Sequence, residues 1–267
     1  MVLPPNPTHE RTEFIIQTAI QRRLTAAQLL VKSSNILNVN KLAEEITNDL
    51  QALGRGSRQG HRPSAQKDFG VYTNDLRSVV KTYRKRLKNH DAELVLDLAQ
   101  ALLAKKVTEC RQVAYELITT HKLARAALNE NIVESLGGGM DNWACVDTFC
   151  SNVAGPAWRE GQLKDTTIER WASSADLWWR RAAVVSTVAL NTKSRGGTGD
   201  VARTLSICEH LLQDTEVMVQ KAISWALREL VPWDREAVET FILKHDGNLS
   251  ARVKREVKRK LDTGKKN

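Results

Sequence analysis

Residues 137–156 of the chain read GGGMDNWACVDTFCSNVAGP and join a glycine triplet to a run with helical spacing. Glycine is unfavourable inside a helix, so the triplet predicts a connector. The side chain of Asp141 or Asn142 is suited to cap the helix that follows. We expect this helix to end near Val153, because a Gly-Pro pair comes next. The stretch therefore predicts short helices joined by short connections.

Trp143 and Asp147 lie four residues apart in this helix, so they share one face. The apolar neighbours of Asp147 mark the core side, which places the carboxylate at the rim of an apolar stripe. Such a carboxylate either pairs with a neighbouring arginine or belongs to a functional site. The stretch alone favours the ion pair, because acidic side chains are seldom buried without a partner.

The composition favours packed helices over a β-sandwich. The 267 residues are enough for one large domain or two small ones with a substantial core. Leu, Ala and Val abound, whereas the chain has 3 Met, 4 Phe and 3 Tyr. No sustained alternation of apolar and polar residues marks a strand.

Metal, disulfide and membrane signals are absent from the sequence. The 4 cysteines form no CxxC pair and the 6 histidines lack ligand spacing, so we expect reduced thiols, no metal and no cofactor. The N-terminus has neither a basic segment nor an apolar core of a signal peptide, and no long apolar run follows. We expect a cytoplasmic protein without a membrane partner, associated with the nucleoid if it is bacterial.

The positive charge is concentrated in two segments. The net charge is +9, and residues 55–88 carry 10 Lys or Arg against Asp68 and Asp75. Residues 244–267 carry 9 Lys or Arg against 3 acidic residues, so the rest of the chain is net acidic. Such clusters are typical of surfaces that bind phosphates, although a solvated basic face has the same composition.

The apolar spacing predicts helices along the whole chain. The first covers residues 8–32, and a second begins at Asn40 and extends to Leu53. A third begins at Thr73 or Asn74 and carries many cations. The remaining predicted helices cover about 91–104, 108–120, 122–136, 141–153, 164–173, 176–191, 200–213, 215–230, 234–245 and 249–261.

Short helices with short connections predict an all-α, HEAT-like helical repeat solenoid, whose repeats run to roughly 40 to 47 residues. A compact all-α bundle is the alternative. We expect N-terminal helices over 1–53, a basic flexible loop over 54–66 and the repeat region over 67–267, in one continuous domain. The loop is either a basic arm that touches nucleic acid or an insertion without that role.

Arg181 lies among apolar residues in the helix predicted from residue 176. A guanidinium in that place needs an anion, which is either a carboxylate of another helix or a phosphate of a ligand. The general pattern favours a structural salt bridge. In the helix over 215–230, Trp225 lies opposite the apolar stripe and shares its face with Lys221 and Arg228. This face suits a sugar-phosphate backbone, or else the helix is buried on both sides.

Five stretches in the chain match one known family in the same order. They are Phe69-Gly70-Val71 with residues 73–77, Trp143-x-x-x-Asp147, Arg180-Arg181-Ala182-Ala183, residues 219–229, and the basic helix that ends at Leu261. By these stretches the chain resembles, over roughly residues 67–262, the AlkD family of DNA alkylation repair enzymes, which are HEAT-like-repeat DNA glycosylases. The resemblance implies that Asp147 is the catalytic carboxylate, that Trp143 and Trp225 line the lesion site, and that Arg181 holds the DNA backbone.

We therefore expect a curved solenoid with a basic concave face, acting as a monomer on double-stranded DNA. Its activity would be that of a monofunctional glycosylase that releases N3- or N7-alkylated purines, with Lys221 and Arg228 among the DNA contacts. A fixed carboxylate suits this chemistry, because the sugar develops oxocarbenium character as the base leaves. Two alternatives are a non-catalytic relative that binds damaged or branched DNA, and a helical scaffold for protein interactions.

Overall fold

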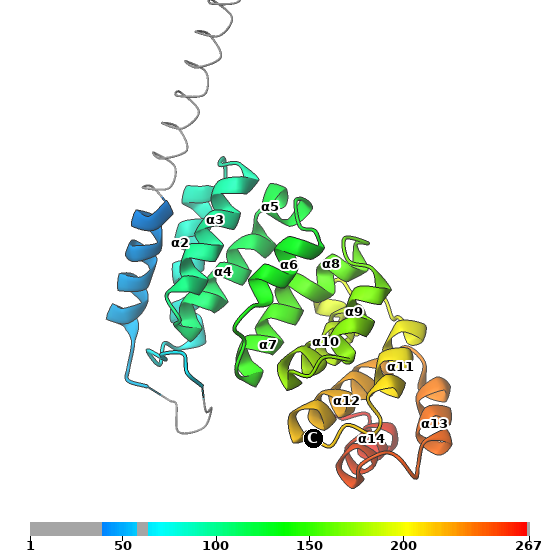
Figure 1. Cartoon of the computed structure of the whole chain (residues 1–267). Coiled ribbons are helices and arrows are strands. Elements are labelled where there is room, and N and C mark those ends of the chain that lie inside the picture. The colour runs from blue at the N-terminus through cyan, green and yellow to red at the C-terminus, as the bar shows by residue number, and fades with distance from the viewer. Residues whose placement is uncertain (1–38, 58–63, 266–267) are drawn as a thin grey trace, which may run out of the picture.

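A computed structural model describes residues 39–57 and 64–265, and every regular element among them is a helix (Figure 1). The only β-type contact in these residues is an isolated bridge between Lys67 and Val107. The helix expected over 8–32 and the middle of the loop expected over 54–66 lie outside the described residues. The all-α prediction is confirmed for the part of the chain that is described.

The helices follow one another with short connections, as the spacing predicts. A helical segment over residues 39–53 precedes those that carry labels. The labelled elements are α2 (Thr73–Leu87), α3 (Ala92–Ala104), α4 (Thr108–Thr120), α5 (Lys122–Ala126), α6 (Glu130–Gly137), α7 (Trp143–Phe149), η2 (Cys150–Ala154), α8 (Gly155–Arg159), α9 (Asp165–Ala172), α10 (Leu177–Asn191), η3 (Lys193–Arg195), α11 (Val201–His210), α12 (Val217–Leu230), α13 (Arg235–Lys244) and α14 (Ala251–Thr263).

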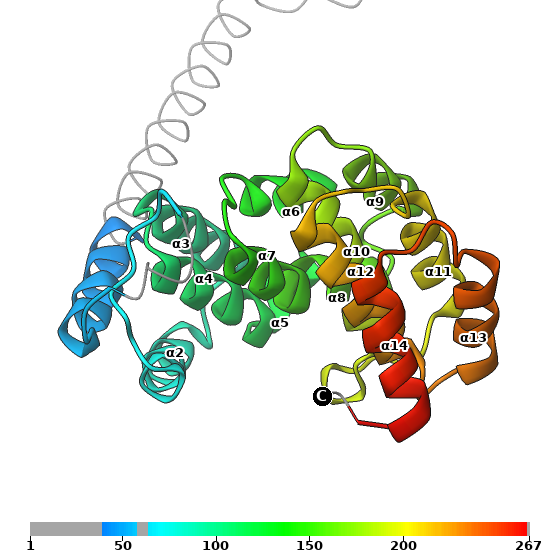
Figure 2. The ribbon, with the colours of Figure 1, turned by 90° about the horizontal axis from the view of Figure 1, so that it is seen from below.

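The helices stack as pairs along a curved array. Successive inner helices pack side by side: α2 on α4, α4 on α7, α7 on α10, α10 on α12, and α12 on α14. The outer helices pack on them, with α3 against α4, α9 against α10 and α11 against α12. Figure 2 shows the array as an arc, with α2 and α14 at the two ends of its concave side. One apolar core runs through the stack from Val39 to Val257.

Many of the helices begin at a capping side chain, close to the residue at which the sequence predicts the helix to start. Asn142 caps α7, because its Oδ1 accepts a hydrogen bond from the amide of Cys145 at 3.0 Å. The neighbouring Asp141 has a different role, since its carboxylate accepts hydrogen bonds from Ser64 Oγ and from the amide of Ala65. This contact ties residues 64–66 to the segment directly before α7.

The helix predicted over 122–136 is in fact two helices, α5 and α6. Asn129 has an extended backbone, with φ −145° and ψ 175°, and its side chain accepts a hydrogen bond from the amide of Ile132. An Asn side chain that caps a new helix competes with continuation of the previous one. The single-helix prediction was wrong because apolar spacing alone does not register this interruption.

The predicted end of the α7 helix near Val153 is also wrong. The backbone stays in the right-handed helical region through the π-helix η2 and into α8, which ends at Arg159. In the π-helical stretch the amide of Gly155 donates to the carbonyl of Cys150. Pro156 lies in the first turn of α8, where a helix tolerates a residue without an amide hydrogen.

Gly155 permits a close approach of α8 to α10. A Cβ atom at this position would lie 2.4 Å from Cβ of Ala189 and 2.9 Å from the carbonyl oxygen of Ser186. The glycine is therefore required by packing between helices and not by a turn. The four cysteines are buried thiols and none forms a disulfide, as expected from the sequence.

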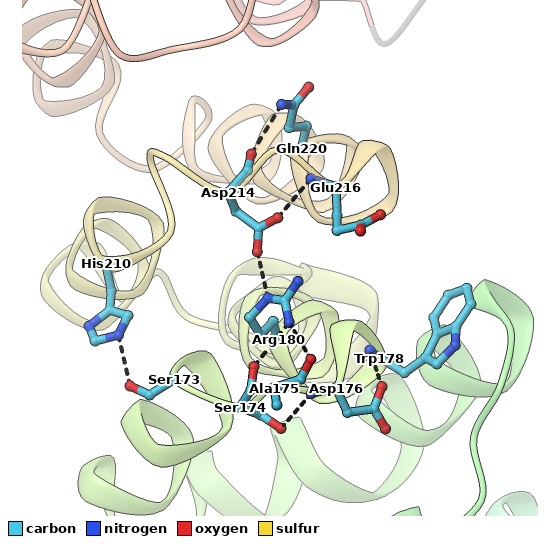
Figure 3. Close-up of polar contacts among 10 residues, drawn as sticks. All are labelled: Ser173, Ser174, Ala175, Asp176, Trp178, Arg180, His210, Asp214, Glu216 and Gln220. Carbon is cyan, nitrogen blue, oxygen red and sulfur yellow. Dashed lines mark hydrogen bonds and ion pairs between the residues drawn. The ribbon is translucent and has the colours of Figure 1, made fainter.

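Arg180 fixes the start of α10 (Figure 3). Its Nε donates to Asp214 Oδ2 at 2.7 Å, and its Nη1 donates to the carbonyls of Ser174 and Ala175 at 3.0 and 2.9 Å. Asp214 lies just before α12 and also accepts from the amide of Glu216 at 2.8 Å. The arginine thus joins the connection before α10 to the connection before α12, which are neighbouring layers of the array.

Candidate functional site

Asp147 of α7 and Arg181 of α10 form a bidentate ion pair. Arg181 Nη2 donates to both carboxylate oxygens, at 2.8 and 3.0 Å, and Nε donates to Oδ1 at 3.0 Å. The side chain of Arg181 is 6% exposed and that of Asp147 is 20% exposed. The arginine therefore lies beneath the carboxylate, and the carboxylate keeps one side open to solvent.

Burial raises the pKa of Asp147, whereas the charge of Arg181 and its hydrogen bonds lower it. The guanidinium is itself held from the other side, because its Nη1 donates to the carbonyl of Met218 in α12. Three helices therefore determine where the carboxylate points. Such a carboxylate is pre-oriented, so it needs little reorganisation to stabilise a positive charge placed above it.

The sequence allowed two kinds of anion as the partner of Arg181, a carboxylate of another helix or a phosphate of a ligand. In the structure the partner is the carboxylate of Asp147. Arg181 is not among the residues that line the pockets near Asp147. Its direct contact with a DNA backbone, which the family resemblance implies, stays a prediction. The adjacent Arg180 has a different partner, Asp214.

Two pockets meet at Asp147 and Trp225. The first has a volume of about 620 Å³ and lies between α12 and α14. The second has a volume of about 410 Å³ and reaches towards α2 and α4. The first is lined by Asp147, Lys221, Trp225, Arg228, Arg252, Arg255, Glu256 and Arg259. The second is lined by Arg77, Gln112, Glu116, Thr119, Thr120, Asp147, Thr148, Ser151, Asn152, Arg195 and Trp225. We call the two together the concave groove.

The helix α12 brings three predicted site residues into the concave groove. Lys221 is exposed, and Trp225 is half-buried with its Nε1 donating to Glu229 at 3.1 Å. Arg228 donates through Nε to the carbonyl of Ser224 at 3.1 Å. One side of the indole packs against the core while the residue also lines both pockets. The second interpretation, a helix buried on both sides, holds in part for Trp225, and the binding of a sugar-phosphate backbone by this face stays a prediction.

Trp143 lies one turn before Asp147, at the first position of α7. It is 41% exposed, which is high for a large apolar side chain. It does not line either pocket of the concave groove. The structure thus places Trp143 on the same helix as Asp147, but its contact with a lesion stays a prediction.

The structure adds basic residues that the site prediction did not include. Arg252, Arg255 and Arg259 of α14 line the first pocket, and Arg77 of α2 lines the second. The positions in α14 recur at helical spacing within the basic segment 244–267, so an amphipathic reading of that segment would have found them. Arg77 becomes part of the site only because the array curves.

Residues 39–57 and 64–265 contain no group of three or more His, Cys, Asp or Glu side chains suited to a metal ion. None of the helices in these residues is both long and apolar enough to cross a membrane.

The comparison with protein families agrees with the geometry. The sequence model of the DNA alkylation repair enzymes matches residues 43–261. This range contains Asp147, Arg181 and the α12 and α14 residues of the concave groove, and it extends further towards the N-terminus than the motifs indicated. No curated protein matches the chain. Since the family match covers most of the sequence, the chain belongs to the family of DNA alkylation repair enzymes.

Proposed function

We propose that this protein is a monofunctional DNA glycosylase that releases N3- or N7-alkylated purines from double-stranded DNA. One observation carries the proposal: Asp147 is held in a fixed orientation by Arg181 at the point where a basic pocket meets a mostly polar one. A carboxylate surrounded by cations is an unusual feature of a surface for phosphate binding. Such a carboxylate is expected where the protein must stabilise a positive charge beside the DNA backbone.

The chemistry requires few groups from the protein. An alkylated purine already carries a positive charge, so the C1′–N bond breaks with its electron pair passing to the base, which leaves neutral. The sugar becomes an oxocarbenium ion, and Asp147 stabilises this charge. A water molecule then adds to C1′, and Asp147 accepts its proton. The products are the free base and an abasic site, and the reaction needs no cofactor.

The residues of the concave groove bind the DNA. Lys221, Arg228 and the arginines of α14 bind phosphates on either side of the lesion, while Trp225 offers an apolar and π surface to the cationic nucleotide. Trp143 contacts the DNA next to Asp147. Arg181 approaches the backbone from beneath the carboxylate. The protein acts as a monomer, because one curved array presents the whole site.

The direct test is base release from a duplex containing N7-methylguanine. We expect the wild-type protein to release the base and Asp147→Asn to lose nearly all activity. Asp97→Asn is the matched control, since Asp97 is exposed on the outer helix α3 and its substitution changes the charge equally. A reaction without protein measures spontaneous depurination.

The same proteins and duplexes distinguish the proposed glycosylase from the two alternative functions. Tight, salt-sensitive binding without release by the wild-type protein would contradict the glycosylase and favour the non-catalytic DNA-binding alternative. Weak binding that barely changes with salt would favour the scaffold for protein interactions. Circular dichroism and thermal unfolding of Asp147→Asn establish whether a loss of activity reflects a loss of fold.

A further inference from the structure

Two carboxylates besides Asp147 line the concave groove: Glu256 of α14, which pairs with Arg228 and Arg252, and Glu116 of α4. Glu116 of α4 lines the same pocket as Asp147 and Trp225 and is half-buried. The residues around it in that pocket are mostly neutral and polar, including Thr119, Thr148 and Asn152 from α4, α7 and η2. Glu116 therefore faces the space next to Asp147 and not the outer surface of the array.

The contacts of Glu116 leave its negative charge without a strong partner. Gln112 Nε2 donates to Glu116 Oε1 at 3.3 Å, which is a long hydrogen bond from a neutral amide. Arg195 lines the same pocket, but it donates to the carbonyl of Ser151 at 3.2 Å and lies 3.5 Å from Asn152 Oδ1. Asp147, in contrast, has its charge offset by Arg181.

An anion in this position is costly for a protein that binds a polyanion. A carboxylate inside the groove repels the phosphates that Arg77, Arg195 and the α14 arginines attract. Its presence fits a ligand group that carries positive charge. In the proposed substrate, the alkylated purine ring is that group. A protonated or alkylated ring near Glu116 would gain an attraction that an ordinary purine lacks.

We infer that Glu116 determines specificity by recognising the positive charge of the alkylated purine. The inference rests on the proposed function and deepens it, because it assigns the choice of substrate to a residue other than Asp147. Asp147 acts on the sugar, where charge appears during the reaction. Glu116 acts on the base, where charge is present before the reaction and disappears as the base leaves. Its contribution is therefore to substrate binding more than to the rate of bond breaking.

The experiment measures binding to two lesions of the same shape. One duplex carries 2′-fluoro-N7-methylguanine, which is cationic and resists hydrolysis. The other carries 2′-fluoro-7-methyl-7-deazaguanine, which is neutral and has the same sugar. The ratio of the two dissociation constants isolates recognition of charge. We expect Glu116→Gln to lower the preference for the cationic duplex roughly fivefold, the upper end for a partly exposed ion pair. Glu116→Asp, which keeps the charge, should retain part of the preference.

The matched control is Glu93→Gln, in the exposed first turn of the outer helix α3. It removes the same charge from the protein, so it reproduces any general gain in DNA affinity, and we expect it to keep the wild-type preference. An unchanged preference in Glu116→Gln would overturn the inference, as would a wild-type protein that does not distinguish the two duplexes. Equal thermal unfolding of the variants excludes misfolding as the cause.

Base release from N7-methylguanine DNA distinguishes this inference from the proposed function. With the wild-type reaction active, we expect Glu116→Gln to raise the half-saturating protein concentration by a larger factor than it lowers the maximal rate. A protein that prefers the cationic duplex through Glu116 but releases no base would contradict the glycosylase and leave the charge recognition intact.

Discussion

Arg181 holds both carboxylate oxygens of Asp147 across a separation of 34 residues in the chain. The two residues come from α7 and α10, which pack side by side on the inner row of the array. This contact gives the carboxylate a defined orientation and lowers its pKa against the effect of burial. The pH dependence of the proposed reaction should therefore depend on Arg181.

Arg181→Gln should move the acid limb of base release to higher pH. The reaction needs ionised Asp147, so the rate falls as pH falls through the pKa of that residue. Burial already raises this pKa above the ordinary value of 3.8, and the variant removes both contributions of Arg181 that lower it. The measurement is a single-turnover rate profile against pH, corrected for spontaneous depurination. Arg170→Gln, which removes an exposed arginine of α9, is the control, and an acid limb that moves equally in both variants would contradict the assignment.

Arg180→Gln should destabilise the fold by about 2 to 3 kcal/mol, because it leaves the buried Asp214 carboxylate without its charged partner. The side chain of Asp214 is 6% exposed and that of Arg180 is 19% exposed. Arg170→Gln is the comparison. The side chain of Arg170 is 56% exposed, so its loss should cost no more than about 1 kcal/mol. Urea unfolding measures both variants, and equal midpoints would show that the contacts in Figure 3 do not hold the layers together.

Gly155→Ala should destabilise the protein by about 1 to 3 kcal/mol through overpacking. The added Cβ would lie 2.4 Å from Ala189 Cβ and 2.8 Å from the carbonyl oxygen of Cys150, so α8 and α10 would have to separate. Gly247→Ala is the matched control, because no atom lies within 4 Å of a Cβ built there. Chemical denaturation should show a loss only for the first variant. A wild-type midpoint for Gly155→Ala would contradict the close packing.

The arginines of α14 should control the salt dependence of DNA binding. Each lost phosphate contact reduces the slope of log affinity against log salt concentration by about 1. The double variant Arg255→Gln with Arg259→Gln should therefore reduce the slope by about 2, on both damaged and undamaged duplexes. Lys164→Gln is the control, since Lys164 precedes α9 and lines neither pocket. A slope that stays constant in the double variant would place the DNA elsewhere.

The sequence by itself determined the helices, most of their ends and the family. Apolar spacing placed the helices from α9 to α14 within three residues of their observed bounds, because periodicity and capping act within a single turn or a single helix. It also showed that Arg181 needs an anion and that Trp225 shares a face with Lys221 and Arg228. These are properties of one helix, so neighbouring residues suffice to reveal them.

Only the tertiary structure decided which faces of the helices pack against one another. The packing of α7 on α10 pairs Arg181 with Asp147, and the packing of α4 on α7 places Glu116 in the same pocket as Asp147. The curvature of the stacked helices adds Arg77 to that pocket. The close packing of Gly155, at the end of the π-helical passage from α7 to α8, against α10 is likewise a contact between helices. Small rotations between successive layers add up over the array. Contacts between distant helices therefore follow from the whole stack and are not encoded in any local stretch.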